Sequence, residues 1–195
     1  MHIKPGIGQP RPVGQAIVDS LFPAGDKGRI PIVGIAGSKG TSLTARLMSW
    51  LLQLTGKHVG LSCRDGLFLD KRMVDKRDCA NWAAGQRLLI NRSVDAAVFE
   101  NGAAMILGEG IAYDRCQVGI VTDAEGAESL ADFDIHNAEQ LYHVLRTQVD
   151  IVLPEGAAVL NAADPLVARM ADLCDGEVIF YGLTPDLPAI AAHRA

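Results

Sequence analysis

The sequence predicts an α/β fold: a doubly wound, mostly parallel sheet with helices on both faces. Short apolar runs rich in Val and Ile recur along the chain, helical patterns separate them, and a glycine-rich turn of the P-loop type follows the first run. Continuous apolar runs are typical of parallel strands buried on both sides, and the intervening helices supply the crossovers. The predicted strands are IPIVGIAG, HVGLSC, VDAAVFE, CQVGIVT, AAVLNA and EVIFYG.

The helical segments between these runs carry apolar residues at three- and four-residue spacing, which places them on one helix face. One stripe consists of Leu43, Leu47 and Leu51, and a second lies within residues 138–145 and includes Ala138, Leu141 and Leu145. The sequence thus predicts one helix directly after the glycine-rich turn and another in the C-terminal half.

Three regions are expected along the chain. Residues 1–29 form a Pro- and Gly-rich lead-in with one short helical stretch, GQAIVDSLF, and residues 30–185 hold the predicted sheet. Residues 186–195 combine prolines with small residues and are expected to be a linker toward an absent C-terminal domain. The segment DKRMVDKRD mixes charges of both signs, which favours a solvated loop or hairpin over a binding patch.

Composition excludes several classes of function. The 195 residues suit one compact domain, and the net charge of −5 with 5% aromatic residues argues against a nucleic-acid-binding surface, which needs a basic face. No apolar run reaches about 18 residues and the N-terminus lacks a signal-peptide core, so we expect a cytoplasmic protein without a membrane partner. Whether it forms a homo-oligomer stays open.

The cysteines and histidines do not predict a metal centre. Cys63, Cys79, Cys116 and Cys174 are widely spaced and favour buried reduced thiols over a disulfide or metal site. Two histidines, His136 and His143, lie seven residues apart without a carboxylate at ligand spacing, which is more typical of packing or surface residues.

The glycine-rich turn is the main candidate for chemistry. Its residues are Gly37, Ser38, Lys39, Gly40, Thr41 and Ser42. Glycines let successive N–H groups converge on a phosphate, and the positive end of the following helix adds to the attraction. Ser42 stands where a magnesium ligand is expected, but Thr41 stands where the Walker pattern has lysine. A tight strand-to-helix turn without a ligand is the alternative interpretation.

Polar residues after two later strands are further candidates, because ligands of open α/β sheets bind at the carboxyl ends of the strands. Glu100 follows VDAAVF and is either a magnesium ligand or a cap for the next turn. Asn161 and Asp164 follow AAVLNA; Asp164 before Pro165 is typical of a helix start, although both side chains could also hold a ribose or an adenine edge.

Several stretches in this order resemble a known family. GQPRPVGQAIVDSLFPAGDKGRIPIVGIAGSKGTS is similar to the lead-in and ATP loop of the cyanophycin synthetases, in their Mur ligase-like part, and DGLFLD, VDAAVFENGA, YDRCQVGIVTD, DIH and AVLNAADPLVARMADLCDG continue the match. The resemblance implies the central, ATP-binding domain of a Mur-type ligase, with ATP and Mg²⁺ as cofactors. It implies amide-bond formation between a carboxylate and an amino acid through an acyl phosphate, with a poly-aspartate-type substrate.

The departures from the family pattern all remove charged side chains. The family lysine position holds Thr41, Ser129 stands where a histidine is expected, Leu145 where a lysine is expected, and Ala163 replaces one acid. Each change removes a charge that would meet phosphate or metal, and phosphoryl transfer depends mainly on such charges. The sequence therefore favours a degenerate or incomplete ligase domain; the alternative is a catalytically inactive nucleotide-binding or scaffolding module.

Overall fold

The computed structural model of the chain describes residues 13–22 and 28–194. Contacts divide the chain into two compact units, Met1–Ile30 and Pro31–Ala195. In the first unit the predicted helical stretch is confirmed as α1, Val13–Leu21. The remainder of the lead-in, residues 1–12 and 23–27, and residue 195 lie outside the described residues.

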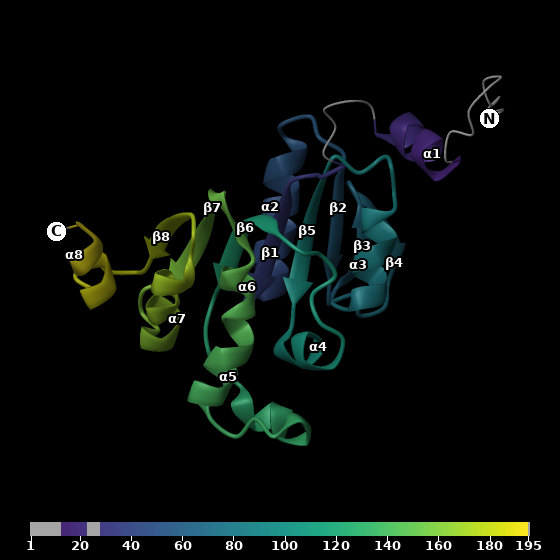
Figure 1. Cartoon of the computed structure of the whole chain (residues 1–195). Coiled ribbons are helices and arrows are strands. Elements are labelled where there is room, and N and C mark those ends of the chain that lie inside the picture. The colour runs from purple at the N-terminus through teal and green to yellow at the C-terminus, as the bar shows by residue number, and fades with distance from the viewer. Residues whose placement is uncertain (1–12, 23–27, 195) are drawn as a thin grey trace. The chain divides into compact units, whose positions relative to one another are not determined.

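The second unit is built on one eight-stranded sheet in the order β4-β3-β2-β5-β1-β6-β7-β8 (Figure 1). All pairs are parallel except β2 with β3 and β3 with β4. The predicted doubly wound α/β fold is confirmed, and each predicted apolar run is a strand. The strands are β1 Ile32–Ala36, β2 Val59–Cys63, β3 Gly66–Leu69, β4 Arg72–Asp75, β5 Ala96–Asn101, β6 Cys116–Val121, β7 Val152–Asn161 and β8 Glu177–Tyr181.

Helices cover both faces of this sheet. Figure 1 places α2, Thr41–Gln53, behind the sheet and α5, Ala138–Leu145, with α6, Thr147–Asp150, in front of it. The other helical elements are α3 Trp82–Leu89, α4 Ala103–Gly108, the 3₁₀ segment Ala127–Phe133, α7 Pro165–Arg169, the 3₁₀ segment Met170–Leu173 and α8 Pro188–Arg194. Residues 186–195, expected as a linker, thus contain a helix.

The core has two parts because successive residues of a buried strand point to opposite faces. On one face Val33 and Ile35 of β1 pack with Ala45 of α2. On the other face Ala36 packs in a larger cluster with Leu141 and other residues of α5, α6 and α7. The alternation fixes which helix each strand residue meets.

Helix α2 faces the sheet with small side chains rather than with its leucine stripe. The buried residues are Thr41, Ala45 and Ser49, which recur every fourth position and so share one helix face. Leu43 and Leu47 are 74% and 50% exposed. The predicted helix is confirmed, but the leucine stripe does not pack on the sheet, because the small residues let the helix backbone approach the strands closely.

A fully buried polar network lies below the carboxyl edge of the sheet. The Asn101 side-chain amide donates to the Tyr113 hydroxyl at 2.8 Å and to Gln148 Oε1 at 2.7 Å. Tyr113 also donates to Gln148 Oε1, at 3.1 Å, and Gln148 is 0% exposed. Every buried polar side-chain atom in the described residues has a partner, which is the usual condition of a stable core.

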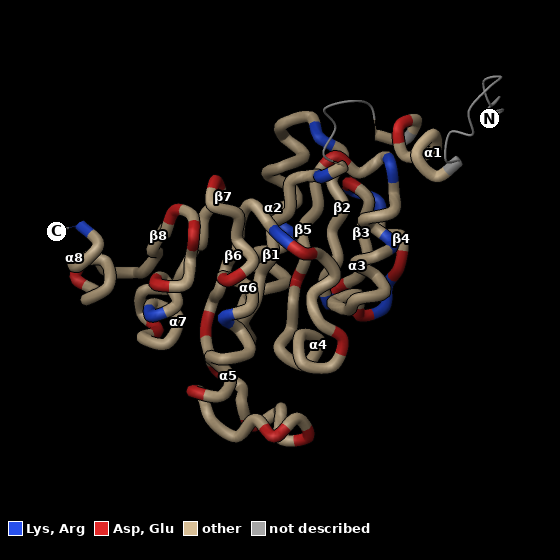
Figure 2. Tube along the Cα trace, in the orientation of Figure 1, with Lys and Arg blue, Asp and Glu red and all other residues tan. Residues whose placement is uncertain are grey.

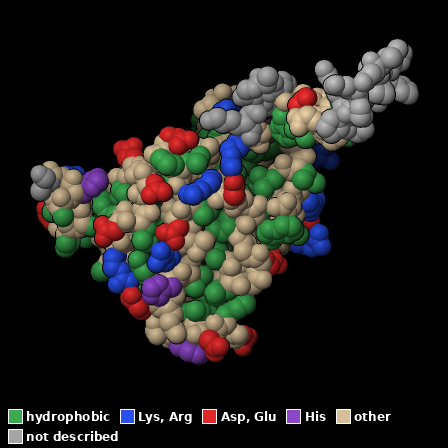
Figure 3. All heavy atoms as spheres, in the orientation of Figure 1, with side chains coloured by type: hydrophobic (Ala, Val, Ile, Leu, Met, Phe, Trp, Pro, Cys, Tyr) green, Lys and Arg blue, Asp and Glu red, His purple; other side chains and the backbone are tan. Residues whose placement is uncertain are grey.

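The charged segment at residues 70–78 forms the turn and second strand of the β3–β4 hairpin, which confirms the hairpin interpretation. Figure 2 shows residues of both signs along it, and Asp75 is paired with Arg77 and Arg87. On the face drawn in Figure 3, apolar side chains reach the surface among charged ones. Within the described ranges, no helix is both long and apolar enough to cross a membrane.

Candidate functional site

The glycine-rich turn joins β1 to α2, and its two glycines are needed for different reasons. Gly37 has φ +131°, and a Cβ there would lie 2.0 Å from the Thr122 hydroxyl oxygen. Gly40 has φ +71°, in the left-handed region, where it precedes the first residue of α2. A Cβ at Gly40 would meet nothing within 4 Å, so open space lies above the turn. The close approach to Thr122 thus excludes a side chain at Gly37, and the left-handed backbone favours glycine at Gly40.

The N-terminus of α2 offers donors to a ligand. The backbone N–H groups of Gly40, Thr41 and Ser42 have no acceptor among residues 13–22 and 28–194. The first N–H groups of a helix lack intrahelical partners and carry the positive end of the helix dipole. An anion such as a phosphate fits this position.

The preceding two N–H groups of the turn are already occupied by a carboxylate. Asp123, two residues after β6, accepts the N–H of Lys39 at 2.9 Å, the N–H of Ser38 at 3.1 Å and the Ser38 hydroxyl at 2.5 Å. Burial raises the pKa of Asp123, but these hydrogen bonds, with those from Thr122 and the Glu125 N–H, outweigh burial, and the pKa lies below its usual value. Asp123 is therefore an internal anion that fixes the turn.

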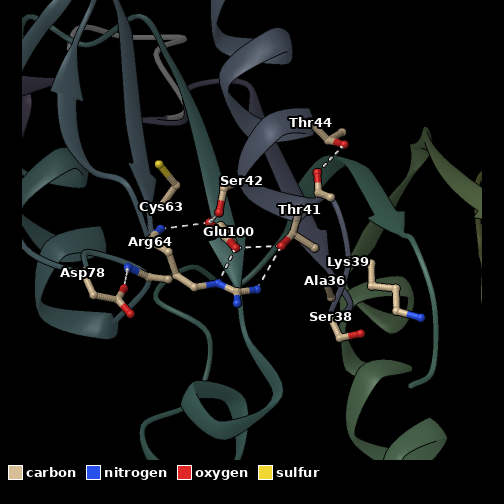
Figure 4. Close-up of polar contacts among 12 residues, drawn as sticks. Ala36, Ser38, Lys39, Thr41, Ser42, Thr44, Cys63, Arg64, Asp78 and Glu100 are labelled. Carbon is tan, nitrogen blue, oxygen red and sulfur yellow. Dashed lines mark hydrogen bonds and ion pairs between the residues drawn. The ribbon is translucent and has the colours of Figure 1, made fainter. Parts of the chain in front are cut away.

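Glu100, the last but one residue of β5, lies at the centre of a second cluster (Figure 4). Its Oε1 accepts the Thr41 hydroxyl at 2.7 Å and Nε–H of Arg64 at 2.8 Å. Its Oε2 accepts the Ser42 hydroxyl at 2.8 Å and the Arg64 backbone N–H at 2.9 Å. A further N–H of the Arg64 guanidinium donates to the Thr41 hydroxyl oxygen at 3.1 Å.

These contacts keep Glu100 ionised although it is only 2% exposed. Burial raises the pKa of Glu100, but the donors from Arg64, Thr41 and Ser42 together outweigh burial and hold the pKa below its ordinary value. The structure thus brings together three of the predicted site residues and adds Arg64. The cluster combines one carboxylate with one guanidinium.

Lys39 lies apart from this cluster. Its side chain points away from Glu100 in Figure 4, is 70% exposed and forms an ion pair with Glu125. Arg64 is the cation nearest to the place of the expected lysine, since it contacts Thr41 directly. Sequence reasoning missed both Arg64 and Asp123. Each follows directly on an apolar strand run, so the rule that selected Glu100 would also have found them.

Asn161 and Asp164 serve as structural anchors of a neighbouring loop. Asp164 caps α7 by accepting the N–H groups of Leu166 and Val167, which agrees with the helix-start interpretation. Its other oxygen accepts the Ala124 N–H at 2.8 Å, and Asn161 donates to the Thr122 carbonyl at 2.9 Å. Both residues therefore fix the segment that carries Asp123.

A cavity of about 270 Å³ opens beside the turn at the carboxyl edge of the sheet. Gly37, Ser38 and Arg64 line one side of it, and Ser129 and Leu145 line another. The two positions where the family pattern suggested a histidine and a lysine thus face the same space as Arg64.

The cluster does not fit a divalent cation. Magnesium takes six oxygen ligands at roughly 2.1 Å, of which a protein commonly supplies one or two carboxylates while phosphates and water supply the others. Both oxygens of Glu100 are taken by two donors each, and one of those donors is a guanidinium whose repulsion of a dication amounts to several kcal/mol at this range. No group of three or more His, Cys, Asp or Glu able to hold a metal occurs in the described parts of the chain. Phosphate oxygens, by contrast, fit the N–H groups of Gly40, Thr41 and Ser42.

The sequence and the fold of this chain are similar to those of known proteins. No family model matches the sequence. The chain is 38% identical over 193 residues to cyanophycin synthetase of Synechocystis, which covers 99% of this chain and 22% of that protein. It superposes with a TM-score of 0.67 on UDP-N-acetylmuramoyl-L-alanyl-D-glutamate–2,6-diaminopimelate ligase, at 13% identity over 88% of this chain and 35% of the ligase. The chain is a Mur ligase-like central domain.

This Mur ligase-like domain spans about a fifth of the length of the synthetases it matches. A further solved structure with the same fold is a bifunctional folylpolyglutamate synthase/dihydrofolate synthase with Mn, AMPPNP and L-glutamate bound. It aligns with a TM-score of 0.57 and 13% identity over 80% of this chain and 44% of the synthase. The fold is thus shared with a ligase and with a synthase whose structure contains AMPPNP.

Proposed function

We propose that this domain binds the phosphates of ATP at the N-terminus of α2 as the nucleotide-binding part of an ATP-dependent amide ligase. The observation that carries the proposal is the geometry of Gly37–Ser42. Two glycines, Gly37 at a close approach to Thr122 and Gly40 in the left-handed region, lead into a 13-residue helix whose first N–H groups have no acceptor in the described residues.

In the proposed reaction a substrate carboxylate attacks the terminal phosphorus of ATP, and ADP leaves. The amine of an amino acid then attacks the acyl phosphate, and inorganic phosphate leaves as the amide bond forms. The similarity to cyanophycin synthetase suggests a poly-aspartate-type carboxylate and an amino acid as substrates. The chemistry would then require a further domain that closes over the cavity beside Arg64.

A second candidate function is a catalytically inactive nucleotide-binding or scaffolding module. Specific observations favour it: Thr41 replaces the loop lysine, and Ser129 and Leu145 bring no charge to the cavity. Asp123 also places a carboxylate on two N–H groups of the turn. Phosphoryl transfer depends on such charges, so their loss would lower the rate far more than it lowers affinity.

Calorimetric titration of the purified chain with ATP tests nucleotide binding. We expect saturable binding, and we expect inorganic triphosphate to compete with ATP because the donors at α2 recognise phosphate oxygens. The matched comparison is Ser42→Ala against Ser93→Ala, an exposed serine whose contacts stay within its own turn. Absence of ATP binding would contradict the proposal.

Product analysis separates the two candidate functions. ATP, an aspartate-type carboxylate and an amino acid are incubated with the chain and with a longer protein that contains it. ADP and phosphate formation that requires both co-substrates supports the ligase. Binding without product formation in either protein supports the inactive module.

A further inference from the structure

We propose that Arg64 supplies the positive charge of the nucleotide site in place of both the loop lysine and a divalent cation, so that phosphate binding here does not require Mg²⁺. This inference rests on the proposed function and names the group that performs it. It is carried by the contacts among Arg64, Glu100 and Thr41, which come from three separate parts of the chain.

The guanidinium reaches the position through two fixed points. The backbone N–H of Arg64 is bonded to Glu100 at 2.9 Å directly after β2, and the side-chain Nε–H returns to the same carboxylate at 2.8 Å. Residue 64 is therefore anchored at both its backbone and its side chain. This double attachment to a buried carboxylate aims the guanidinium toward the start of α2.

Thr41 completes the replacement of the lysine. Its hydroxyl donates to Glu100 and accepts from Arg64, and the residue is 2% exposed. A small hydroxyl at position 41 leaves room for the guanidinium, and it also links that group to the helix N-terminus. The charge that the family pattern carries on residue 41 is thus found on residue 64, whose guanidinium contacts Thr41.

Arg64 retains donors for a ligand. A guanidinium has five N–H groups in one plane, of which one meets Glu100 and one meets Thr41. The remaining three have no acceptor in the described residues, the side chain is 47% exposed, and Arg64 lines the cavity beside the turn. Planar N–H pairs match phosphate oxygens in a bidentate manner.

Electrostatic balance explains why a metal is not required. Glu100 contacts the first two residues of α2 through their hydroxyls, and Arg64 already neutralises it within hydrogen-bond distance. A dication at Glu100 would have to displace the guanidinium, whereas a phosphate can bind to the free N–H groups with the existing pair intact. Asp78 and Glu125 also face the cavity; Glu125 is paired with Lys39, and Asp78 accepts the Ala80 N–H.

The test is calorimetric titration of ATP and of AMPPNP into the full chain, once with excess EDTA and once with Mg²⁺. We expect the two dissociation constants of the natural sequence to agree within about threefold. Arg64→Ala should weaken binding about ten- to a hundredfold under both conditions, the range that loss of a charge-assisted hydrogen bond gives. Arg87→Ala is the matched control, with a side chain 48% exposed and paired to Asp75, and it should change affinity less than about threefold.

A double variant guards against misfolding of Arg64→Ala, in which Glu100 loses its partner. Thr41→Lys/Arg64→Ala returns the positive charge to the turn and removes both donors to Oε1 of Glu100. That oxygen can then bind Mg²⁺, so we expect ATP binding by this variant to recover only when Mg²⁺ is present. If the natural sequence binds ATP only with Mg²⁺, or if folded Arg64→Ala binds as well as the natural sequence, this inference is wrong and the proposed function stands. If the natural sequence binds no nucleotide under either condition, both are wrong.

Discussion

Replacing Asp123 by asparagine tests whether a buried carboxylate holds the glycine-rich turn. Asp123 is 6% exposed and accepts backbone N–H groups from Ser38, Lys39 and Glu125 as well as the hydroxyls of Ser38 and Thr122. An amide keeps one acceptor oxygen and turns the other position into a donor that faces N–H groups. The substitution therefore preserves shape while removing the charge and half of the acceptors.

The expected cost follows from these contacts. Hydrogen bonds to a charged acceptor contribute about 1.5–3 kcal/mol and neutral ones about 0.5–1.5 kcal/mol. The Lys39 N–H loses its acceptor outright, whereas the Thr122 hydroxyl can turn to the Ala36 carbonyl at 3.3 Å. Allowing for water at this half-open edge, we expect Asp123→Asn to lower the free energy of unfolding by about 2–4 kcal/mol at neutral pH.

The effect should depend on pH in a defined direction. The folded pKa of Asp123 is lowered, so the stabilisation is complete above the unfolded value of about 3.9 and is lost as pH falls through the folded pKa. The difference between the natural sequence and Asp123→Asn should therefore shrink below about pH 4.

Urea denaturation followed by far-ultraviolet circular dichroism measures both quantities. Asp132→Asn, at an exposed position, is the control and should change the free energy of unfolding by less than about 0.5 kcal/mol. A loss below about 1 kcal/mol for Asp123→Asn at neutral pH, or a loss that stays constant into acid, would refute the reasoning.

Three further predictions address the rest of the fold. Gln148→Leu should lower the free energy of unfolding by about 2–4 kcal/mol in urea denaturation, since it leaves two buried donors without their acceptor; a loss under about 1 kcal/mol would show that the network relaxes. Leu47→Ala should cost less than about 1 kcal/mol because Leu47 is half exposed, whereas Ala45→Leu, at a 0% exposed position against the sheet, should cost about 1–3 kcal/mol; the reverse order in thermal unfolding would overturn the orientation of α2. Iodoacetamide should modify half-buried Cys174 in the folded protein but leave Cys63 unreacted until urea unfolds the chain, because burial raises the pKa of the Cys63 thiol to about 11; mass spectrometry after proteolysis reads out both sites.

Local signals were enough to predict the architecture. Short, mostly apolar runs such as CQVGIVT are typical of strands covered on both faces, and the helical periodicity between them indicates crossovers. Asp164 before Pro165 predicted the start of a helix, and the structure confirms it. This prediction was possible because helix capping depends only on neighbouring residues. The two glycines likewise predicted a tight turn, since a left-handed backbone and a close approach of the backbone to other atoms both favour glycine.

Which face of α2 packs on the sheet was not decided by its periodicity. Both the leucine stripe and the stripe of Thr41, Ala45 and Ser49 repeat every four residues, and a hydrophobicity rule selects the leucines. The sheet selects the small residues instead, because position 41 must reach Glu100 on β5 while the helix backbone stays close to the strands. The choice depends on a contact 59 residues away in the chain.

The sequence by itself determined the class of fold, the phosphate-type turn and the absence of a lysine at position 41, because each of these is a property of residues that are adjacent or regularly spaced. Only the tertiary structure decided where the charges of the site lie. Arg64 comes 23 residues after Thr41 and 36 before Glu100, and Asp123 comes 84 residues after Lys39. Their side chains meet because parallel strands bring their carboxyl ends to one edge of the sheet. The position of each residue after an apolar run can be read from the sequence, but the order of the strands in the sheet, which decides the neighbours, cannot.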